Sequence, residues 1–240
     1  MTQILKYVGK TNEQFTRLMV NLAVSACKTN SETPKLLDPM CGKGTTLYEG
    51  LIRGFDVVGV EINDKWVHEI ETFIVKFMKT GKYKHKAQNG KLPGPNGKKM
   101  ADYFTLNTAA KKEDFIAGNV QKMQLYSADT RKIDLLLKKE SCDMIVSDLP
   151  YGVQHGTKND SDKDRSPLWL MQVALPSWYS ALKTNGSVVL SFNEFTMKRK
   201  DLAVLMEEKG FTVLEDSPYI NYLHRVDQSI NRNIIVAIKA

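Results

Sequence analysis

The sequence predicts an α/β fold in which a mostly parallel sheet carries helices on both faces. Short apolar runs alternate with segments of helical periodicity along most of the 240 residues. The last two apolar runs follow one another without a helix between them, which indicates one antiparallel edge strand. Hydrophobic residues make up 42% of the chain, enough for a globular core, and we expect a single domain over residues 1–240.

The first third of the chain alternates helices with buried strands. Thr11 and Gln14 have the spacing of a capping box that opens the first helix, and Gly54 stops the second. The third helix carries its apolar residues at intervals of three and four. In order, we expect a helix over 12–28, a strand over 35–38, a helix over 45–53, a strand over 57–61 and a helix over 64–79.

Residues 80–118 interrupt this alternation. They are rich in glycine and proline and resemble an insertion more than a core element. The window from Gly81 to Lys112 contains eight lysines, no arginine and one acid, so it accounts for the whole formal net charge of +7. A local positive field of this kind favours a polyanionic partner such as a nucleic acid. The alternative is a solvated loop that touches nothing.

The alternation resumes after the insertion. One helix begins behind Ser166 and Pro167, and Pro176 is expected to bend it. The two final strands are expected to be joined by a long loop. In order, we expect a strand over 122–127, a short helix over 131–139, a strand over 142–148, a helix over 167–182, a strand over 186–192, a helix over 197–209, and strands over 211–216 and 233–240.

Four acidic residues fall at the carboxyl ends of predicted strands: Asp38, Glu61, Asp129 and Asp148. In sheets of this class, ligands bind at the carboxyl ends of the strands. We therefore expect the four acids to meet in one site. For any single one of them, a helix cap or a solvated turn is the alternative.

A glycine-containing turn follows the strand that ends at Asp38. Gly42 and Gly44 let backbone amides approach a ligand closely. The turn is no phosphate-binding P-loop, because Leu37 occupies the first glycine position. It departs from the dinucleotide motif, because Leu47 replaces the third glycine. S-adenosylmethionine fits better, because Asp38 can hold its amino group and the molecule has no pyrophosphate.

The remaining donor contacts are expected at the ends of the next two strands. Glu61 is placed to accept both ribose hydroxyls, although a solvated strand-end acid is the alternative. Ala128 and Asp129 are placed to fix the adenine amine. The residues expected to bind the donor are Asp38, Met40, Cys41, Gly42, Gly44, Thr45, Thr46, Glu61, Ile62, Ala128, Asp129 and Asp148.

The segment 147–152, Ser-Asp-Leu-Pro-Tyr-Gly, is suited to methylating the amino group of a nucleobase. Such nitrogens are poor nucleophiles because their lone pair is delocalised into the ring. The Asp148 carboxylate and the Leu149 carbonyl can accept the amine hydrogens, so that the nitrogen pyramidalises. Pro150 restricts the backbone that aims this carbonyl, and Tyr151 can stack on the base. A purely structural turn is the alternative.

Metal chemistry and membrane insertion are not expected. The four histidines lack ligand spacing, and no apolar stretch is long enough to span a bilayer. The three cysteines Cys27, Cys41 and Cys142 are interpreted as reduced thiols of a cytoplasmic protein. None is placed as the nucleophile that methylation of pyrimidine carbon-5 requires.

These motifs resemble those of the class I S-adenosylmethionine-dependent methyltransferases, and more narrowly those of the THUMP-associated tRNA guanosine-2-amino methylases. LLDPMCGKGTT with VVGVEIN resembles the donor-binding pair, and SDLPYG resembles the catalytic motif. Segments 9–23 and 223–233 resemble the family's helix before the donor loop and its final loop and strand. The resemblance implies a Rossmann-like sheet of seven strands. Nothing in the sequence resembles a THUMP domain, and the lysine-rich insertion is expected to substitute for it as an RNA grip.

The resemblance implies methyl transfer to the 2-amino group of guanosine in RNA, with tRNA favoured. The alternatives are the 6-amino group of adenine in DNA or RNA, a protein glutamine or small amine, and a donor- or RNA-binding module without activity. Leu149 favours guanosine, because adenine enzymes usually carry a second proline there. RNA contacts are expected through Lys82–Lys112, with Arg225 and Arg232 as further candidates. The loop 153–165 is expected to order over substrate, or else to be a disordered connector. The sequence does not determine the oligomeric state.

Overall fold

The computed structural model describes residues 12–94, 97–151 and 166–240. The chain forms two compact units, which are described separately. Unit 1 contains Glu32–Thr130 and the chain up to Arg17; unit 2 contains Leu18–Ser31 and Arg131–Ala240. The single domain expected over residues 1–240 stays a prediction.

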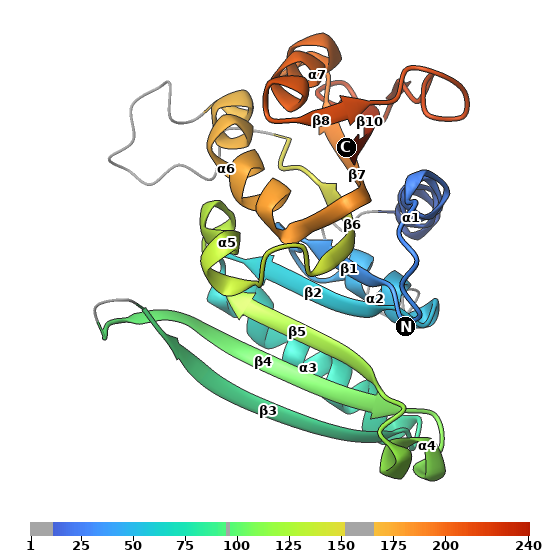
Figure 1. Cartoon of the computed structure of the whole chain (residues 1–240), viewed down its shortest axis with the longest axis vertical. Coiled ribbons are helices and arrows are strands. Elements are labelled where there is room, and N and C mark those ends of the chain that lie inside the picture. The colour runs from blue at the N-terminus through green and yellow to red at the C-terminus, as the bar shows by residue number, and fades with distance from the viewer. Residues whose placement is uncertain (1–11, 95–96, 152–165) are drawn as a thin grey trace. The chain divides into compact units, whose positions relative to one another are not determined.

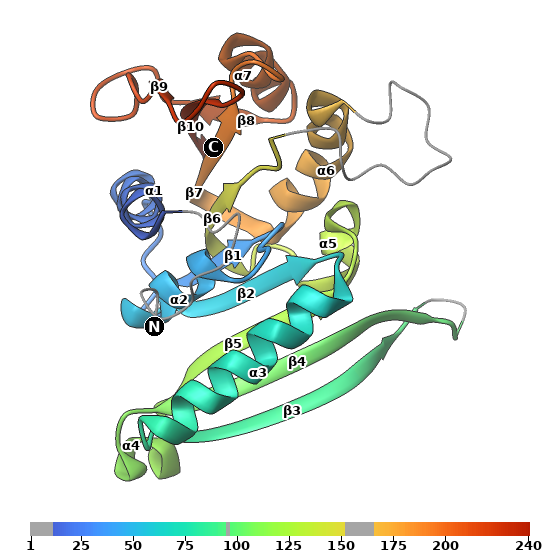
Figure 2. The same ribbon diagram turned by 180° about the vertical axis from the view of Figure 1, so that it is seen from behind.

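Unit 1 contains a sheet with parallel strands in the order β5-β2-β1 and two connecting helices on one face. The helices α2 and α3 pack against each other, with the rings of Tyr48 and Phe73 5.1 Å apart. Figure 2 shows α3 lying across β5, β4 and β3. The elements are β1 (Lys35–Asp38), α2 (Thr45–Ile52), β2 (Asp56–Glu61), α3 (Asp64–Thr80), β3 (Lys84–Pro93), β4 (Lys99–Ala109), α4 (Lys112–Ala117) and β5 (Gln121–Ser127).

The segment predicted as an insertion extends this sheet instead of leaving it. The strands β3 and β4 form a long antiparallel hairpin, and β4 pairs antiparallel with β5 (Figure 1). Phe104 and Leu106 are buried, and the Thr108 hydroxyl lies 3.3 Å from the sulfur of Met78 on α3. The prediction missed these strands because lysines and glycines on the exposed edge strand conceal the alternation that marks a half-buried strand.

Unit 2 contains the strands β6, β7, β10 and β8, which are neighbours in that order. The strands β6 and β7 are parallel, whereas β10 runs antiparallel to both β7 and β8. The antiparallel strand therefore lies between two others, and its predicted position at the edge was wrong. Residues 233–237 of β10 are all buried, which suits an interior strand, whereas the edge strand β8 has three residues.

The remaining elements of unit 2 lie close to their predicted positions. In α1, the Asn12 side chain accepts the backbone N–H of Gln14 at 2.8 Å and that of Phe15 at 3.3 Å, so it caps the helix. The predicted capping residue Thr11 lies outside the described residues. Pro176 lies inside α6. The elements are α1 (Glu13–Ala26), which begins in unit 1, a 3-10 turn at Thr130–Lys132, α5 (Ile133–Leu136), β6 (Cys142–Asp148), α6 (Pro167–Ala181), β7 (Leu182–Asn193), α7 (Arg199–Glu208), β8 (Phe211–Val213), β9 (His224–Arg225) and β10 (Asn231–Lys239).

The predicted α/β class is confirmed, with strands and helices alternating along the chain and parallel pairing in both units. The described residues contain ten strands instead of the expected seven. The three additional strands are the hairpin strands β3 and β4 and the short β9, which pairs with the start of β10. None of the helices in the described part of the chain combines the length and hydrophobicity that a bilayer crossing requires.

A buried carboxylate fastens the segment after α1 to β6. Asp143 is fully buried and accepts hydrogen bonds from the hydroxyls of Thr29, at 2.8 Å, and Ser31. The ammonium of Lys183 lies 2.8 Å from the same carboxylate oxygen. These donors offset the cost of removing a charge from water.

We predict that Asp143→Ala lowers the free energy of unfolding by about 1–3 kcal/mol, because the hydroxyls and the ammonium lose their shared acceptor. Urea unfolding followed by circular dichroism measures the change. The exposed Asp216 supplies a matched control, for which Asp216→Ala is expected to change the midpoint little. Equal midpoints for the two variants would contradict the role given to Asp143.

Candidate functional site

The turn between β1 and α2 is built on one buried acid and two glycines. Asp38, the last residue of β1, is 3% exposed, and its Oδ1 accepts the backbone N–H of Met40 at 3.2 Å. Gly42 and Gly44 have φ angles of 52° and 84°, in the left-handed region that L side chains rarely adopt. Gly44 also precedes the first residue of α2, Thr45. The backbone of this turn therefore requires the two glycines that mark it in the sequence.

Glu61, at the end of β2, holds this turn. Its Oε2 accepts the backbone N–H of Gly42 at 2.9 Å, and its Oε1 accepts that of Asn63 at 2.9 Å. Burial raises the pKa of the Glu61 carboxyl, and hydrogen bonds from the backbone amides of Asn63, Gly42 and Ile62 oppose this rise. Each carboxylate oxygen can accept more than one hydrogen bond, so Glu61 keeps acceptor capacity for a ligand with hydroxyl groups.

Cys41 turns its side chain into the core and not toward open space. Its backbone N–H donates to the carbonyl of Val60 at 3.0 Å, and its sulfur packs against Gly59 of β2. Burial, followed by the negative charges of Asp38 and Glu61, raises the pKa of the Cys41 thiol well above its usual range. The thiol is therefore neutral at physiological pH, and this residue can offer a ligand only its backbone.

Four further residues predicted to bind the donor lie next to Glu61 or at the start of α2: Ala128, Ile62, Thr45 and Thr46. The backbone N–H of Ala128 donates to the Glu61 carbonyl at 3.0 Å, which joins the ends of β5 and β2. Ile62 is 66% exposed, so an apolar side chain faces solvent beside the buried acid. Thr45 and Thr46 are buried at the start of α2. A Cβ added to Gly42 would meet nothing within 4 Å, so there is open space beside this backbone.

Unit 2 contains the predicted catalytic segment. Asp148 is the last residue of β6, and the next residue, Leu149, is buried and donates its backbone N–H to the carbonyl of Ser191 at 2.8 Å. The Tyr151 hydroxyl donates to Oδ1 of Asp148. Pro150, which comes between Leu149 and Tyr151 in the sequence, is half-buried. The structure therefore connects the predicted acid and the predicted aromatic directly.

Two further residues surround Tyr151 and were not predicted to do so. The Ser191 hydroxyl, on β7, lies 3.3 Å from the Tyr151 hydroxyl. The guanidinium of Arg232, on β10, lies 5.2 Å from the centre of the Tyr151 ring, within the range of a cation–π contact. Burial, followed by the negative charge of Asp148, raises the pKa of the Tyr151 hydroxyl. Tyr151 therefore stays protonated and remains a hydrogen-bond donor.

Arg225 and Arg232, both predicted to contact phosphates, have different surroundings in the structure. Arg232 is 9% exposed and contacts Tyr151, which disfavours its predicted phosphate contact, whereas Arg225 is exposed on β9. Of the four strand-end acids, three belong to unit 1 and Asp148 to unit 2. Their meeting in one site stays a prediction. Gly152 and the loop 153–165, predicted to order over substrate, lie outside the described residues.

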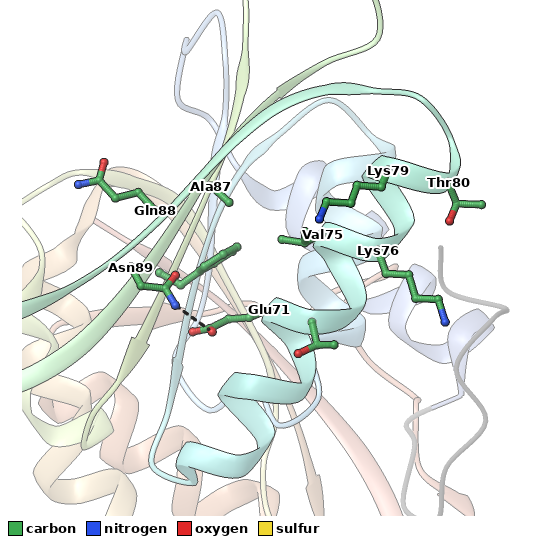
Figure 3. Close-up of a pocket in the computed structure, with 10 residues that line it drawn as sticks. Glu71, Val75, Lys76, Lys79, Thr80, Ala87, Gln88 and Asn89 are labelled. Atoms are coloured by element: carbon green, nitrogen blue, oxygen red, sulfur yellow. Dashed lines mark hydrogen bonds between the residues drawn. The ribbon is translucent and has the colours of Figure 1, made fainter.

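A separate groove of about 650 Å³ lies between α3 and β3 (Figure 3). Glu71 and Asn89 face each other across it, with 3.3 Å between Nδ2 of Asn89 and Oε2 of Glu71. Burial raises the pKa of the Glu71 carboxyl. Lys76 and Lys79 of α3 also line the groove, and none of the predicted site residues does. Among residues 12–94, 97–151 and 166–240, no group of three or more histidine, cysteine or acidic side chains is arranged to hold a metal ion.

Comparison with known families and solved structures identifies the family and the fold of the chain. A family model described as "UPF0020: RMKL-like, methyltransferase domain" matches residues 6–215. No curated protein shows significant sequence similarity to the chain. Among solved structures, an rRNA methylase from Streptococcus thermophilus is 8% identical with a TM-score of 0.54, over 96% of this chain and 98% of that one.

Two further solved structures of methyltransferases share the fold. An S-adenosylmethionine-dependent methyltransferase from Clostridium acetobutylicum is 11% identical, with a TM-score of 0.57 over 96% of this chain and 92% of that one. The magnesium protoporphyrin IX methyltransferase of Synechocystis, solved with bound S-adenosylmethionine, is 13% identical. Its TM-score is 0.54 over 98% of this chain and 87% of that one. At these identities the likeness establishes the fold and leaves the substrate open.

We predict that Gly59→Ala destabilises the turn between β1 and α2 and the strand beside it. An added Cβ would lie 2.6 Å from Leu47, 2.8 Å from Leu125 and 2.9 Å from the Cys41 sulfur. Relieving these clashes is expected to lower the free energy of unfolding by about 1–3 kcal/mol, as measured by urea unfolding. The double variant with Cys41→Ala is expected to recover only part of the loss, because the two leucine contacts remain. Wild-type stability of the single variant would contradict this packing.

Proposed function

Since the chain belongs to the UPF0020 family of RMKL-like methyltransferase domains, we propose that it methylates an exocyclic amino group of a nucleobase in RNA. The predicted resemblance to class I S-adenosylmethionine-dependent methyltransferases is confirmed at the level of the family. The guanosine 2-amino group and tRNA are the finer parts of the proposal. The observation that carries it is the Asp148–Tyr151 pair, which joins an acceptor for amine hydrogens to an aromatic ring.

The methyl donor is S-adenosylmethionine, as predicted, and the residues of unit 1 fit it. When bound, this cofactor supplies an electrophilic methyl group on a sulfonium centre. We propose that Glu61 accepts its ribose hydroxyls with the acceptor capacity left by the Gly42 and Asn63 amides. The exposed Ile62 offers apolar surface for the adenine. Ala128 and Asp129 come directly after β5, and we propose that they fix the adenine amine. The open space beside Gly42 leaves room for a ligand at the turn.

The acceptor chemistry is assigned to the segment after β6. As the nitrogen–carbon bond forms and the sulfur–carbon bond breaks, the amine becomes positively charged and then loses a proton to Asp148 or to water. We propose that the Asp148 carboxylate and the Leu149 carbonyl accept the amine hydrogens beforehand, which directs the nitrogen lone pair away from the ring. In the structure Oδ1 of Asp148 accepts the Tyr151 hydroxyl, so an incoming amine has to share or replace this donor.

RNA as the substrate is supported by charge. The segment Lys82–Lys112 contains the hairpin β3–β4, and its eight lysines are exposed, as is Arg225 on β9. We propose that the segment contacts RNA phosphates, in the role of the RNA grip expected from the sequence. A cytoplasmic location is part of the proposal and is supported by Cys27, Cys41 and Cys142, none of which forms a disulfide.

The experiment that tests the function is mass spectrometry of nucleosides from tRNA, rRNA and DNA of a deletion strain and its complemented parent. The proposal expects loss of N2-methylguanosine from one RNA fraction and its return on complementation. Loss of N6-methyladenine instead would replace guanosine by adenine as the target. Unchanged nucleosides in all three fractions would overturn the proposal.

We predict that donor binding depends on the ionisation of Glu61. Calorimetry with S-adenosylhomocysteine is expected to show weakening as the pH falls, because a protonated carboxyl is a poorer acceptor. Burial raises the pKa of Glu61, so the weakening is expected to begin above the ordinary glutamate value of about 4.3. Glu61→Gln is expected to bind weakly at all pH values and to lose this dependence. A variant with wild-type affinity would remove Glu61 from the donor site.

We predict that Asp148→Ala lowers kcat by about 100-fold or more, because the amine loses a positioned acceptor. Donor affinity, measured by calorimetry, is expected to fall only moderately. Tyr151→Phe is the matched comparison, because it removes the hydroxyl that Asp148 accepts and keeps the ring. It is expected to keep a much larger share of kcat. Full activity of Asp148→Ala would exclude the carboxylate from the mechanism.

A further inference from the structure

The sheet of β3, β4 and β5 has one face covered by α3 and one face turned away from it. Asn89 of β3 bonds to Glu71 of α3, and Phe104 and Thr108 of β4 pack on the same helix side. Because side chains alternate along a strand, their sequence neighbours point to the opposite face. Figure 1 looks onto this opposite face, and Figure 2 looks onto α3. We call it the open face.

The strand register arranges the open face in three rows. The first row is Gly90, Tyr103 and Tyr126. The second row is Gln88, Thr105 and Gln124. The third row is Lys86, Asn107 and Lys122. Lys84 continues β3 on the same face, two residues before Lys86.

Tyr103 lies across β3 because Gly90 has no side chain. A Cβ on Gly90 would lie 2.4 Å from both Cζ and Oη of Tyr103 and 2.7 Å from its Cε1. The outer end of the ring therefore covers the glycine. Tyr103 is half-buried, whereas Tyr126 in the same row is 9% exposed. Tyr103 is thus the aromatic surface that the open face presents to a ligand.

The charge of the open face is positive. Lys84, Lys86 and Lys122 are exposed, and no residue of the three rows is acidic. The nearest acid at the β2 margin is Asp56, whose Oδ1 accepts the Lys122 backbone N–H at 2.8 Å. Gly90 lies four positions after Lys86, about 13 Å along a strand. Cationic side chains and an aromatic ring thus share one face, with a row of amide- and hydroxyl-bearing side chains between them.

We propose that the open face binds a single-stranded segment of the RNA substrate. One base stacks on Tyr103, and the three lysines contact phosphates. Stacking on one face of a ring requires a base that is free of its own helix, which is why the segment is single-stranded. Gln88, Thr105 and Gln124 supply hydrogen-bond groups between the ring and the lysines. This inference rests on the proposed function, which makes RNA the substrate.

The covered side of the hairpin is a poorer candidate for RNA. Glu71 lines the groove between α3 and β3. Asp102 lines a smaller pocket that shares Glu71 and Asn89 with this groove, and it forms an ion pair with Lys99. Two carboxylates in and beside this groove oppose a phosphate. Its lysines, Lys76 and Lys79, nevertheless provide charge-matched controls on the same unit.

The test measures binding of a fluorescein-labelled single-stranded RNA oligonucleotide by fluorescence anisotropy. Tyr103→Leu is expected to weaken binding about 5- to 150-fold, the size of one base–aromatic stack, and Tyr103→Phe is expected to bind like the wild type. Gly90→Ala is expected to weaken binding as well, because the added methyl group displaces the ring. Circular dichroism and affinity for S-adenosylhomocysteine confirm that each variant is folded.

The lysines are tested by salt dependence. Lys86→Glu with Lys122→Glu is expected to reduce the slope of log affinity against log salt by roughly 0.7 for each lost phosphate contact. The control Lys76→Glu with Lys79→Glu is expected to leave the slope close to that of the wild type. Equal effects of the two pairs, or unchanged affinity of Tyr103→Leu, would overturn the inference.

Failure of this inference and failure of the proposed function would give different results. If the chain methylated no RNA, the nucleosides of the deletion strain would be unchanged, while Tyr103→Leu would still lose affinity for the oligonucleotide. If the open face bound no RNA, Tyr103→Leu would restore methylation in the deletion strain as fully as the wild type and would bind the oligonucleotide unchanged.

Discussion

The buried carboxylate of Glu61 is the constraint on which the turn between β1 and α2 depends. At 7% exposure a carboxylate has to be hydrogen-bonded, and the amides of Gly42 and Asn63 each donate to one of its oxygens. To reach it, the turn after β1 adopts left-handed φ angles that only glycine tolerates well. The same path directs the Cys41 side chain into the core against Gly59. The hydrogen bonds of Glu61 thus fix the conformation of the turn, and this conformation favours glycine at positions 42 and 44.

The segment after β6 follows a different principle. Asp148 accepts the hydroxyl of Tyr151, and Tyr151 is in turn bordered by Ser191 and Arg232. These contacts fix the aromatic ring in place and keep the carboxylate satisfied. If Asp148 accepts a substrate amine as we propose, the amine exchanges one donor for another at this carboxylate, which costs less than desolvating an unpartnered carboxylate.

The sequence predicted those parts of the fold and the candidate site whose signals are local. Strand-end acids, paired glycines and the Asp-Leu-Pro-Tyr segment each lie within a few consecutive residues, and the structure places them at strand ends. Ser191 and Arg232 could not be predicted as partners of Tyr151, because their position depends on the pairing of β7 with β10. The hairpin of β3 and β4 was missed, because an edge strand with alternating lysines resembles a polar loop. The interior position of β10 likewise depends on pairing between strands far apart in the sequence.

The lysines of β3 have a consequence for the behaviour of the protein in solution. An edge strand ten residues long presents a row of backbone donors and acceptors to which a second molecule can add. Charged side chains along such an edge repel an identical strand and so protect against aggregation. Replacing Lys84 and Lys86 by neutral residues would weaken this protection. A variant stripped of surface charge for crystallisation would therefore risk self-association through this edge.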